Sequence, residues 1–224
     1  MNKFRRHFMQ SAAATMLVMG TGRWAQAGAY TDFFRAVQID DVGAVQSLLA
    51  QGFDPNAVDS KGNSALYLAL RYKALKVAKV LIENPHIHLN QLNPSDENAL
   101  MIACLQGDLG IVKLMVDKGA EINKPGWTPL SYAATRGHTE IVKYLLDHSA
   151  YIDAAAPNGS TPLMMAAYFG YDSTVKLLLE EGADPRLKNA MGYTALTLAT
   201  NMHHKDIADM IVKALGKDRP QGSW

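Results

Sequence analysis

The chain has 224 residues, with 22 Lys and Arg against 21 Asp and Glu, and 48% of its residues are hydrophobic. This near-neutral balance argues against a nucleic-acid-binding protein, which needs a clustered basic face. The single cysteine, Cys104, excludes an internal disulfide, even in an oxidising compartment.

The first 27 residues have the features of an export signal. They hold four basic residues and no acidic one, and an apolar run from Ser11 to Met19 is too short to span a membrane. Ala25-Gln26-Ala27 is a small-x-small sequence, which predicts cleavage between Ala27 and Gly28. Cleavage would leave 18 of the 22 basic residues against 21 acidic ones, a net charge of −3.

The charged part of this segment resembles a twin-arginine export signal. That motif has two arginines, any residue, a phenylalanine, then an apolar and a polar residue, and the chain reads Arg5-Arg6-His7-Phe8-Met9-Gln10. Arg23 before the cleavage site agrees, whereas Phe4 stands where the motif more often has Ser or Thr. The alternative is a plain secretory signal with a chance arginine pair. Both predict a periplasmic protein that is free of the membrane after signal cleavage.

From residue 30 onward one sequence motif recurs at a nearly fixed interval. It reads Thr128-Pro129-Leu130-Ser131-Tyr132-Ala133 and then Thr161-Pro162-Leu163-Met164-Met165-Ala166. Looser copies place their leucines at Leu66, Leu100 and Leu196, so the steps between successive leucines are 34, 30, 33 and 33 residues. A step of about 33 residues with the pattern T-P-L-x-x-A is typical of the ankyrin repeat, which this chain resembles.

Each unit is expected to form an inner helix, a tight turn and an outer helix. Around Leu130 the inner helix ends near Gly137, because glycine adopts a left-handed turn easily. The outer helix then carries a buried stripe of Ile141, Val142, Leu145 and Leu146. The Thr caps the start of the inner helix, and the Pro after it needs no backbone donor there.

The resemblance implies an all-α ankyrin-repeat solenoid over residues 28–215. A first, less regular unit has Phe33 in place of the leucine and Ala36 in place of the alanine. The six expected units are 30–60, 61–94, 95–124, 125–157, 158–190 and 191–215. The last outer helix is expected to end at Leu215, before a polar, disordered tail at 216–224.

Several units depart from the regular pattern. The turn glycine is replaced by Asp40, Lys73 and His203 in units one, two and six. The loop 84–90 after unit two has one extra residue, and the loop 123–127 after unit three is about three residues short. These irregular finger loops are places where a binding site could be shaped.

The resemblance also implies a protein-binding scaffold, because ankyrin proteins hold partners with their loop tips and the concave face of their inner helices. Those places lie five and six residues after each leucine and three before it. In units two to six they hold these aromatic residues and arginines: Arg71, Tyr72, Trp127, Arg136, Tyr168, Phe169 and Tyr193. Such residues are enriched in protein interfaces, so these seven are the predicted binding residues. Alternatively some rings, notably Tyr72 and Phe169, pack in the core.

No catalytic motif is present, and the sequence predicts neither an enzyme nor a cofactor. His86 and His88 occupy alternate positions of a finger loop and could clamp a metal ion with a third ligand, but the sequence supplies no evident third. Cys104 follows an inner-helix alanine and is interpreted as a small core residue rather than a reactive thiol.

The sequence therefore predicts an exported, monomeric scaffold that binds another protein, for example in support of a periplasmic enzyme. One alternative is an inhibitor or immunity-type binder of an enzyme or toxin. Another is a metal- or cofactor-holding protein that uses His86 and His88. A fold of this kind does not identify the partner.

Overall fold

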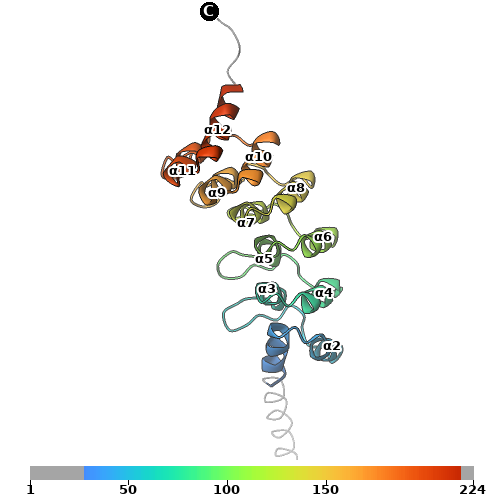
Figure 1. The fold of residues 1–224 in the computed structure, drawn as a ribbon. Helices are drawn as coiled ribbons and strands as arrows, with labels where there is room; N and C mark the ends of the chain where they lie inside the picture. Colours follow the sequence, from blue (N-terminus) through green and yellow to red (C-terminus); the bar gives the residue numbers. More distant parts are fainter. Residues whose placement is uncertain (1–27, 218–224) are drawn as a thin grey trace, which may run out of the picture.

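A computed structural model describes residues 28–217, which fold into a stack of helices (Figure 1). Residues 28–38 are helical. The helices that follow are α2 (Val42–Ala50), α3 (Ala65–Arg71), α4 (Leu75–Glu83), α5 (Ala99–Gln106), α6 (Leu109–Asp117), α7 (Pro129–Thr135), α8 (Thr139–Asp147), α9 (Pro162–Phe169), α10 (Asp172–Glu180), α11 (Ala195–Asn201) and α12 (Lys205–Lys217). In the described part of the chain the β structure is limited to one bridge, so the expected all-α class is confirmed.

The helices form two columns that run side by side (Figure 1). In the inner column α3, α5, α7, α9 and α11 pack on one another in that order, and in the outer column α2, α4, α6, α8, α10 and α12 do the same. Each inner helix from α3 onward also packs on the outer helix that follows it in the chain. The expected solenoid of six helix–turn–helix units is confirmed. None of the described helices is long and apolar enough to cross a membrane.

The residue before each inner helix closes its first turn. The side chain of Thr128 accepts a hydrogen bond from the backbone N–H of Ser131, and Pro129 takes the first helical position, where no donor is needed. The same side-chain cap occurs at Ser64, Asn98, Thr161 and Thr194. The recurring sequence motif therefore determines where each inner helix begins, as the sequence predicts.

Between the two helices of each unit the backbone passes through a left-handed residue. In three units this residue is glycine, and in the other three it is Asp40, Lys73 or His203, with φ of 59°, 59° and 62°. A residue with a Cβ costs about 1–2 kcal/mol in this conformation, because the Cβ approaches the carbonyl oxygen. These three turns keep the geometry of the others at a local cost in stability.

The residue that follows the turn packs on the turn of the preceding unit. The ring of His138 covers Gly107, where an added Cβ would lie 2.4 Å from the Cε1 of His138. Its Nε2 lies 3.1 Å from the carbonyl oxygen of Leu105, so this histidine braces the turn of unit three. In the same way Tyr171 covers Gly137 in the turn of unit four, and His204 covers Gly170 in the turn of unit five.

A second link joins successive units where the outer helices end. The Oδ1 of Asn123 accepts a hydrogen bond from the backbone N–H of Tyr151, one unit further on, at 2.9 Å. In the same way the side-chain oxygens of Asn56, Asn90 and Asp153 accept hydrogen bonds from the backbone N–H groups of His88, Glu121 and Asp184, respectively. We call these four bonds the loop ladder. It fixes each unit relative to its neighbour, so the stack is held by more than apolar contact.

The apolar core continues along the whole stack. Phe33 is fully buried, which confirms that it replaces the leucine of the first unit. Cys104 is also fully buried, and burial raises the pKa of its thiol. A thiol that stays protonated and hidden is a poor nucleophile, so Cys104 is a core residue as expected.

The predicted end of the last helix is wrong by two residues. α12 continues through Gly216 to Lys217, because Gly216 does not take the left-handed conformation that commonly ends a helix. The predicted export signal and cleavage site at residues 1–27, and most of the predicted tail, lie outside the described residues.

Candidate protein-binding face

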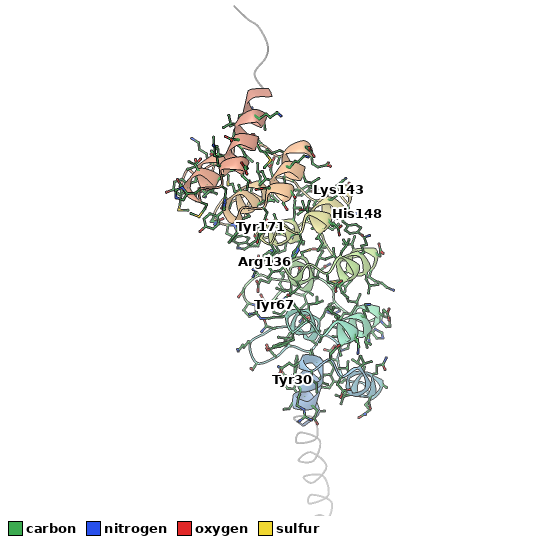
Figure 2. The ribbon with its side chains drawn as sticks, in the orientation of Figure 1. Tyr30, Tyr67, Arg136, Lys143, His148 and Tyr171 are labelled. Carbon is green, nitrogen blue, oxygen red and sulfur yellow. The ribbon has the colours of Figure 1, made fainter. Side chains whose placement is uncertain are left out.

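One side of the stack is formed by the C-terminal ends of α3, α5, α7, α9 and α11 and by the finger loops that lead into these helices. We call it the inner face. Figure 2 shows Tyr67 and Arg136 on the inner column, and Lys143 and His148 on the outer column. The seven residues that the sequence predicts for partner binding all belong to these helix ends and loops.

Six of the seven predicted binding residues are exposed, namely Arg71, Tyr72, Arg136, Tyr168, Phe169 and Tyr193. Tyr72 is 52% exposed and Phe169 is 44% exposed, so neither ring is part of the core. Trp127 is half-buried and packs edge-on against Tyr132, with the ring centroids 6.2 Å apart. The part that these seven residues play in partner binding stays a prediction. Because most of them are exposed, they can be substituted to test it.

A carboxylate outside the predicted set lies at the centre of the inner face. The Oε1 of Glu97 accepts a hydrogen bond from the hydroxyl of Tyr132 at 2.6 Å, and its Oε2 accepts one from the hydroxyl of Tyr67 at 2.7 Å. The side-chain N–H of Asn93 also donates to Oε2, at 3.1 Å. Tyr67 belongs to α3, Glu97 to the loop before α5 and Tyr132 to α7, so one carboxylate joins three successive units.

These contacts fix the charge of the cluster. Burial raises the pKa of Glu97, but the hydrogen bonds from Tyr132, Tyr67 and Asn93 and the charge of Arg71 together lower the pKa below its ordinary value. Burial, and then the bond to Glu97, raises the pKa of both tyrosines. Glu97 is therefore anionic and the tyrosines neutral at physiological pH, and donors from the chain itself already occupy the carboxylate.

The short finger loop before α7 is closed by Lys124. Its Nζ lies 2.6 Å from Oδ2 of Asp96 in the preceding finger, and it donates to the carbonyl oxygens of Pro125 and Trp127 at 2.8 and 3.3 Å. The Lys124 side chain is only 9% exposed. A lysine thus fills the space of the missing loop residues and positions Trp127 on the inner face.

The inner face of the last two units is apolar. The rings of Tyr168 and Phe169 meet in a T-shaped contact with their centroids 4.9 Å apart. Tyr193, Met202 and Met191 are exposed on the neighbouring helix end and finger, and Met191 is 68% exposed. Large apolar side chains gathered in this way are typical of a surface that binds another molecule.

The two histidines of the metal-holding alternative lie on an exposed loop. Asn56 holds its backbone, because the Nδ2 of Asn56 donates to the carbonyl oxygen of His86 at 2.8 Å and its Oδ1 accepts from the N–H of His88 at 2.6 Å. Among residues 28–217 no three His, Cys, Asp or Glu side chains gather as a metal ion requires. His86 and His88 therefore lack a third ligand in that part of the chain.

Comparison with known proteins identifies the family. The family described as ankyrin repeats (3 copies) matches residues 33–125, 122–189 and 154–220. The chain belongs to the ankyrin-repeat family. Repeats of this family generally mediate binding between proteins, and their fold is typically a non-catalytic scaffold.

Two bacterial proteins resemble the chain over most of its length. The putative ankyrin repeat protein YahD of Escherichia coli K12 is 31% identical over 193 residues, which are 82% of this chain and 95% of YahD. The crystal structure of an ankyrin repeat domain from Acinetobacter baumannii AYE has a TM-score of 0.71 at 29% identity, covering 81% of this chain and 96% of that domain.

A third similarity covers less. Ankyrin repeat and SAM domain-containing protein 6 of Rattus norvegicus is 34% identical over 109 residues, which are 47% of this chain. The matched region is only 12% of the rat protein's own length. The similarity therefore concerns the repeats alone.

Proposed function

We propose that this chain is a scaffold that binds another protein through its inner face. The observation that supports the proposal is the row of exposed aromatic rings and arginines at the ends of rigid inner helices, from Tyr72 in unit two to Tyr193 in unit six. Such residues contribute most of the binding energy in protein interfaces. Glu97 has no free acid–base role in this proposal, since two tyrosine hydroxyls already occupy it.

The proposal places the protein in the bacterial periplasm, where it supports an enzyme that it meets after export. Its basis is the sequence of residues 1–27, with the Arg5-Arg6 pair and the Ala25-Gln26-Ala27 cleavage sequence. Replacing Arg5 and Arg6 together by Lys tests the export route. Cell fractionation should then find the chain in the cytoplasm, whereas a plain secretory signal would still export it, because lysines keep the required positive charge.

The binding proposal is tested by capture of a partner from a periplasmic extract. The bait is residues 28–224, beside a variant with Trp127→Ala, Arg136→Ala and Tyr168→Ala. A matched control, Lys79→Ala, Tyr151→Ala and Val212→Ala, changes exposed side chains away from the inner face. We expect one protein to be retained by the bait and the control and lost with the inner-face variant. Equal retention by all three would contradict the inner face as the binding site.

The half-buried position of Trp127 requires a check on folding. Circular dichroism and thermal denaturation should show the same helix content and a similar midpoint for all three proteins. If Trp127→Ala lowers the midpoint, Tyr193→Ala replaces it, because Tyr193 is exposed. The activity of a captured enzyme then separates support from inhibition, since a supporting scaffold raises or preserves that activity and an inhibitor lowers it.

A further inference from the structure

In units two to six the ends of the inner helices carry no carboxylate, and those of α3 and α7 carry positive charge. In units two to six the last residues of the inner helix and the turn residue are Arg71-Tyr72-Lys73, Leu105-Gln106-Gly107, Thr135-Arg136-Gly137, Tyr168-Phe169-Gly170 and Asn201-Met202-His203. We call these positions the cationic strip. The 21 acidic residues of the chain all lie after residue 27 and outnumber the basic ones there, so the strip opposes the charge of the solenoid as a whole.

The carboxylates of the neighbouring fingers are already engaged. Glu97 accepts from Tyr67 and Tyr132, and Asp96 pairs with Lys124 at 2.6 Å. Asp59 accepts from the backbone N–H groups of its own loop, at Lys61 and Asn63, and its pKa is lowered. These acids are held by donors of the chain, so they offer little to an incoming cation.

The cations of the strip are less engaged. The side chains of Lys73 and Arg136 form no hydrogen bond or ion pair with any residue in the range 28–217. Arg71 is more engaged, because its charge acts on both Glu97 and Tyr67, but its side chain is exposed. Cations near the C-terminal end of a helix complement its dipole, but that does not account for a complete absence of acids over five units. The charge available to a partner on this strip is positive.

The strip changes character along the stack. Units two and four contribute Arg71, Lys73 and Arg136, whereas units five and six contribute the exposed apolar side chains of Tyr168, Phe169 and Met202. A partner that lies along the strip meets positive charge at units two and four, separated by the uncharged Leu105 and Gln106 of unit three, and then an apolar surface over units five and six. Charge complementarity and burial of apolar area together define what fits.

We propose that the cationic strip binds an acidic linear segment of the partner protein, with aromatic or aliphatic side chains at one end. Its carboxylates pair with Arg71, Lys73 and Arg136, and its apolar side chains cover Tyr168 and Phe169. Packed helices lie about 8–10 Å apart, so five inner helices span about 32–40 Å. An extended segment of about 12 residues covers this span at about 3.3 Å per residue.

The test uses a display library of random peptides of about 12 residues, selected against the full chain. The charge variant is Arg71→Gln with Arg136→Glu. The matched control is Lys79→Gln with Lys213→Glu, which removes the same charge from exposed lysines of the outer helices α4 and α12. We expect peptides selected on the native chain and the control to be enriched in Asp and Glu, with Phe, Trp, Tyr, Leu or Met at one end.

The charge variant should lose this acidic enrichment. Fluorescence anisotropy with one selected peptide should then give a dissociation constant at least about 10-fold higher for the charge variant than for the control, and weaker binding as salt is added. Selection of basic or uncharged peptides, the same peptides on the charge variant, or no enriched peptide at all would overturn the proposal.

This inference rests on the proposed function, but the two fail separately. One outcome would leave the scaffold function standing. In it, the native chain captures a partner that the Trp127→Ala, Arg136→Ala and Tyr168→Ala variant loses, and a saturating selected peptide does not prevent the native chain from binding that partner. This outcome would overturn the acidic linear segment, because the peptide and the partner would then use different contacts.

Discussion

Asp40 in the first unit caps the outer helix of the second unit, because its Oδ1 accepts a hydrogen bond from the backbone N–H of Val77 at 2.8 Å. The residue before that helix, Ala74, has no side chain to offer as a cap. Asp40 is also one of the three turn residues that adopt a left-handed backbone without being glycine. The side chain that strains the turn of one unit therefore stabilises the next unit.

Asp40→Ala removes this cap and leaves the backbone strained. We expect the free energy of unfolding to fall by about 1–2 kcal/mol, the usual effect of losing a helix cap. Asp40→Asn keeps a side-chain oxygen and tolerates the left-handed conformation, so its loss should be smaller. Urea denaturation followed by circular dichroism measures both, and equal losses would argue against the cap.

Lys73→Gly should stabilise the protein by about 1 kcal/mol. Lys73 has a φ of 59°, and glycine relieves the strain that a Cβ causes there. The reverse change, Gly137→Ala, should destabilise, because its φ is 69° and the new Cβ would lie 2.3 Å from Cδ1 of Tyr171. Thermal midpoints of the two variants should move in opposite directions. A lower midpoint for Lys73→Gly would show that this turn is not strained.

Glu97 should make the stability of the fold depend on pH. Because its folded-state pKa lies below the ordinary value of 4.5, the carboxylate stabilises the fold above that pH, and this stabilisation is lost as pH falls through the folded pKa. Glu97→Gln should cost roughly 1 kcal/mol at pH 7, since the amide cannot accept both tyrosine hydroxyls equally well, and this cost should shrink as pH falls through the folded pKa of Glu97. Glu83→Gln, on the exposed face of α4, is the control and should show no such dependence.

Asp153→Asn should stabilise the protein slightly at neutral pH. Burial raises the pKa of Asp153, the backbone N–H of Asp184 offsets this in part, and the charge of Asp184 raises the pKa further. The ionised form of Asp153 is therefore unfavourable in the fold. In the other three hydrogen bonds of the loop ladder the accepting residue is asparagine. We expect a gain below about 1 kcal/mol, since the group is only half-buried. The gain should disappear near pH 3, where Asp153 is protonated, and a gain that is independent of pH would refute this explanation.

Local sequence predicts most of this fold. Thr128-Pro129 marks a helix start, and the spacing of the leucines gives the number of units, because both features depend on neighbours in the chain and on a fixed period. Phe33 is recognised as the core residue of the first unit for the same reason. The end of α12 is missed, since a glycine near a helix end stops the helix only when its backbone turns left-handed.

The centre of the inner face could not be predicted in the same way. Tyr67 follows Leu66 directly, whereas Tyr132 stands two residues after Leu130, so the two tyrosines occupy different positions of the repeat. Only the three-dimensional stack brings both hydroxyls to Glu97. The closure of the short finger by Lys124 is likewise a contact between two loops, and loop length alone indicates only that residues are missing.

Glu97 also changes how the stack responds to thermal fluctuation. A solenoid held by contacts between neighbours alone opens one repeat at a time from its ends. The carboxylate of Glu97 in unit three binds tyrosines of units two and four, which ties these three repeats into a single cooperative block. Amide hydrogens of α3, α5 and α7 would then exchange through one shared opening, while the terminal repeats fray independently. Within this block the distance between Arg71 and Arg136 stays fixed even when the terminal repeats open.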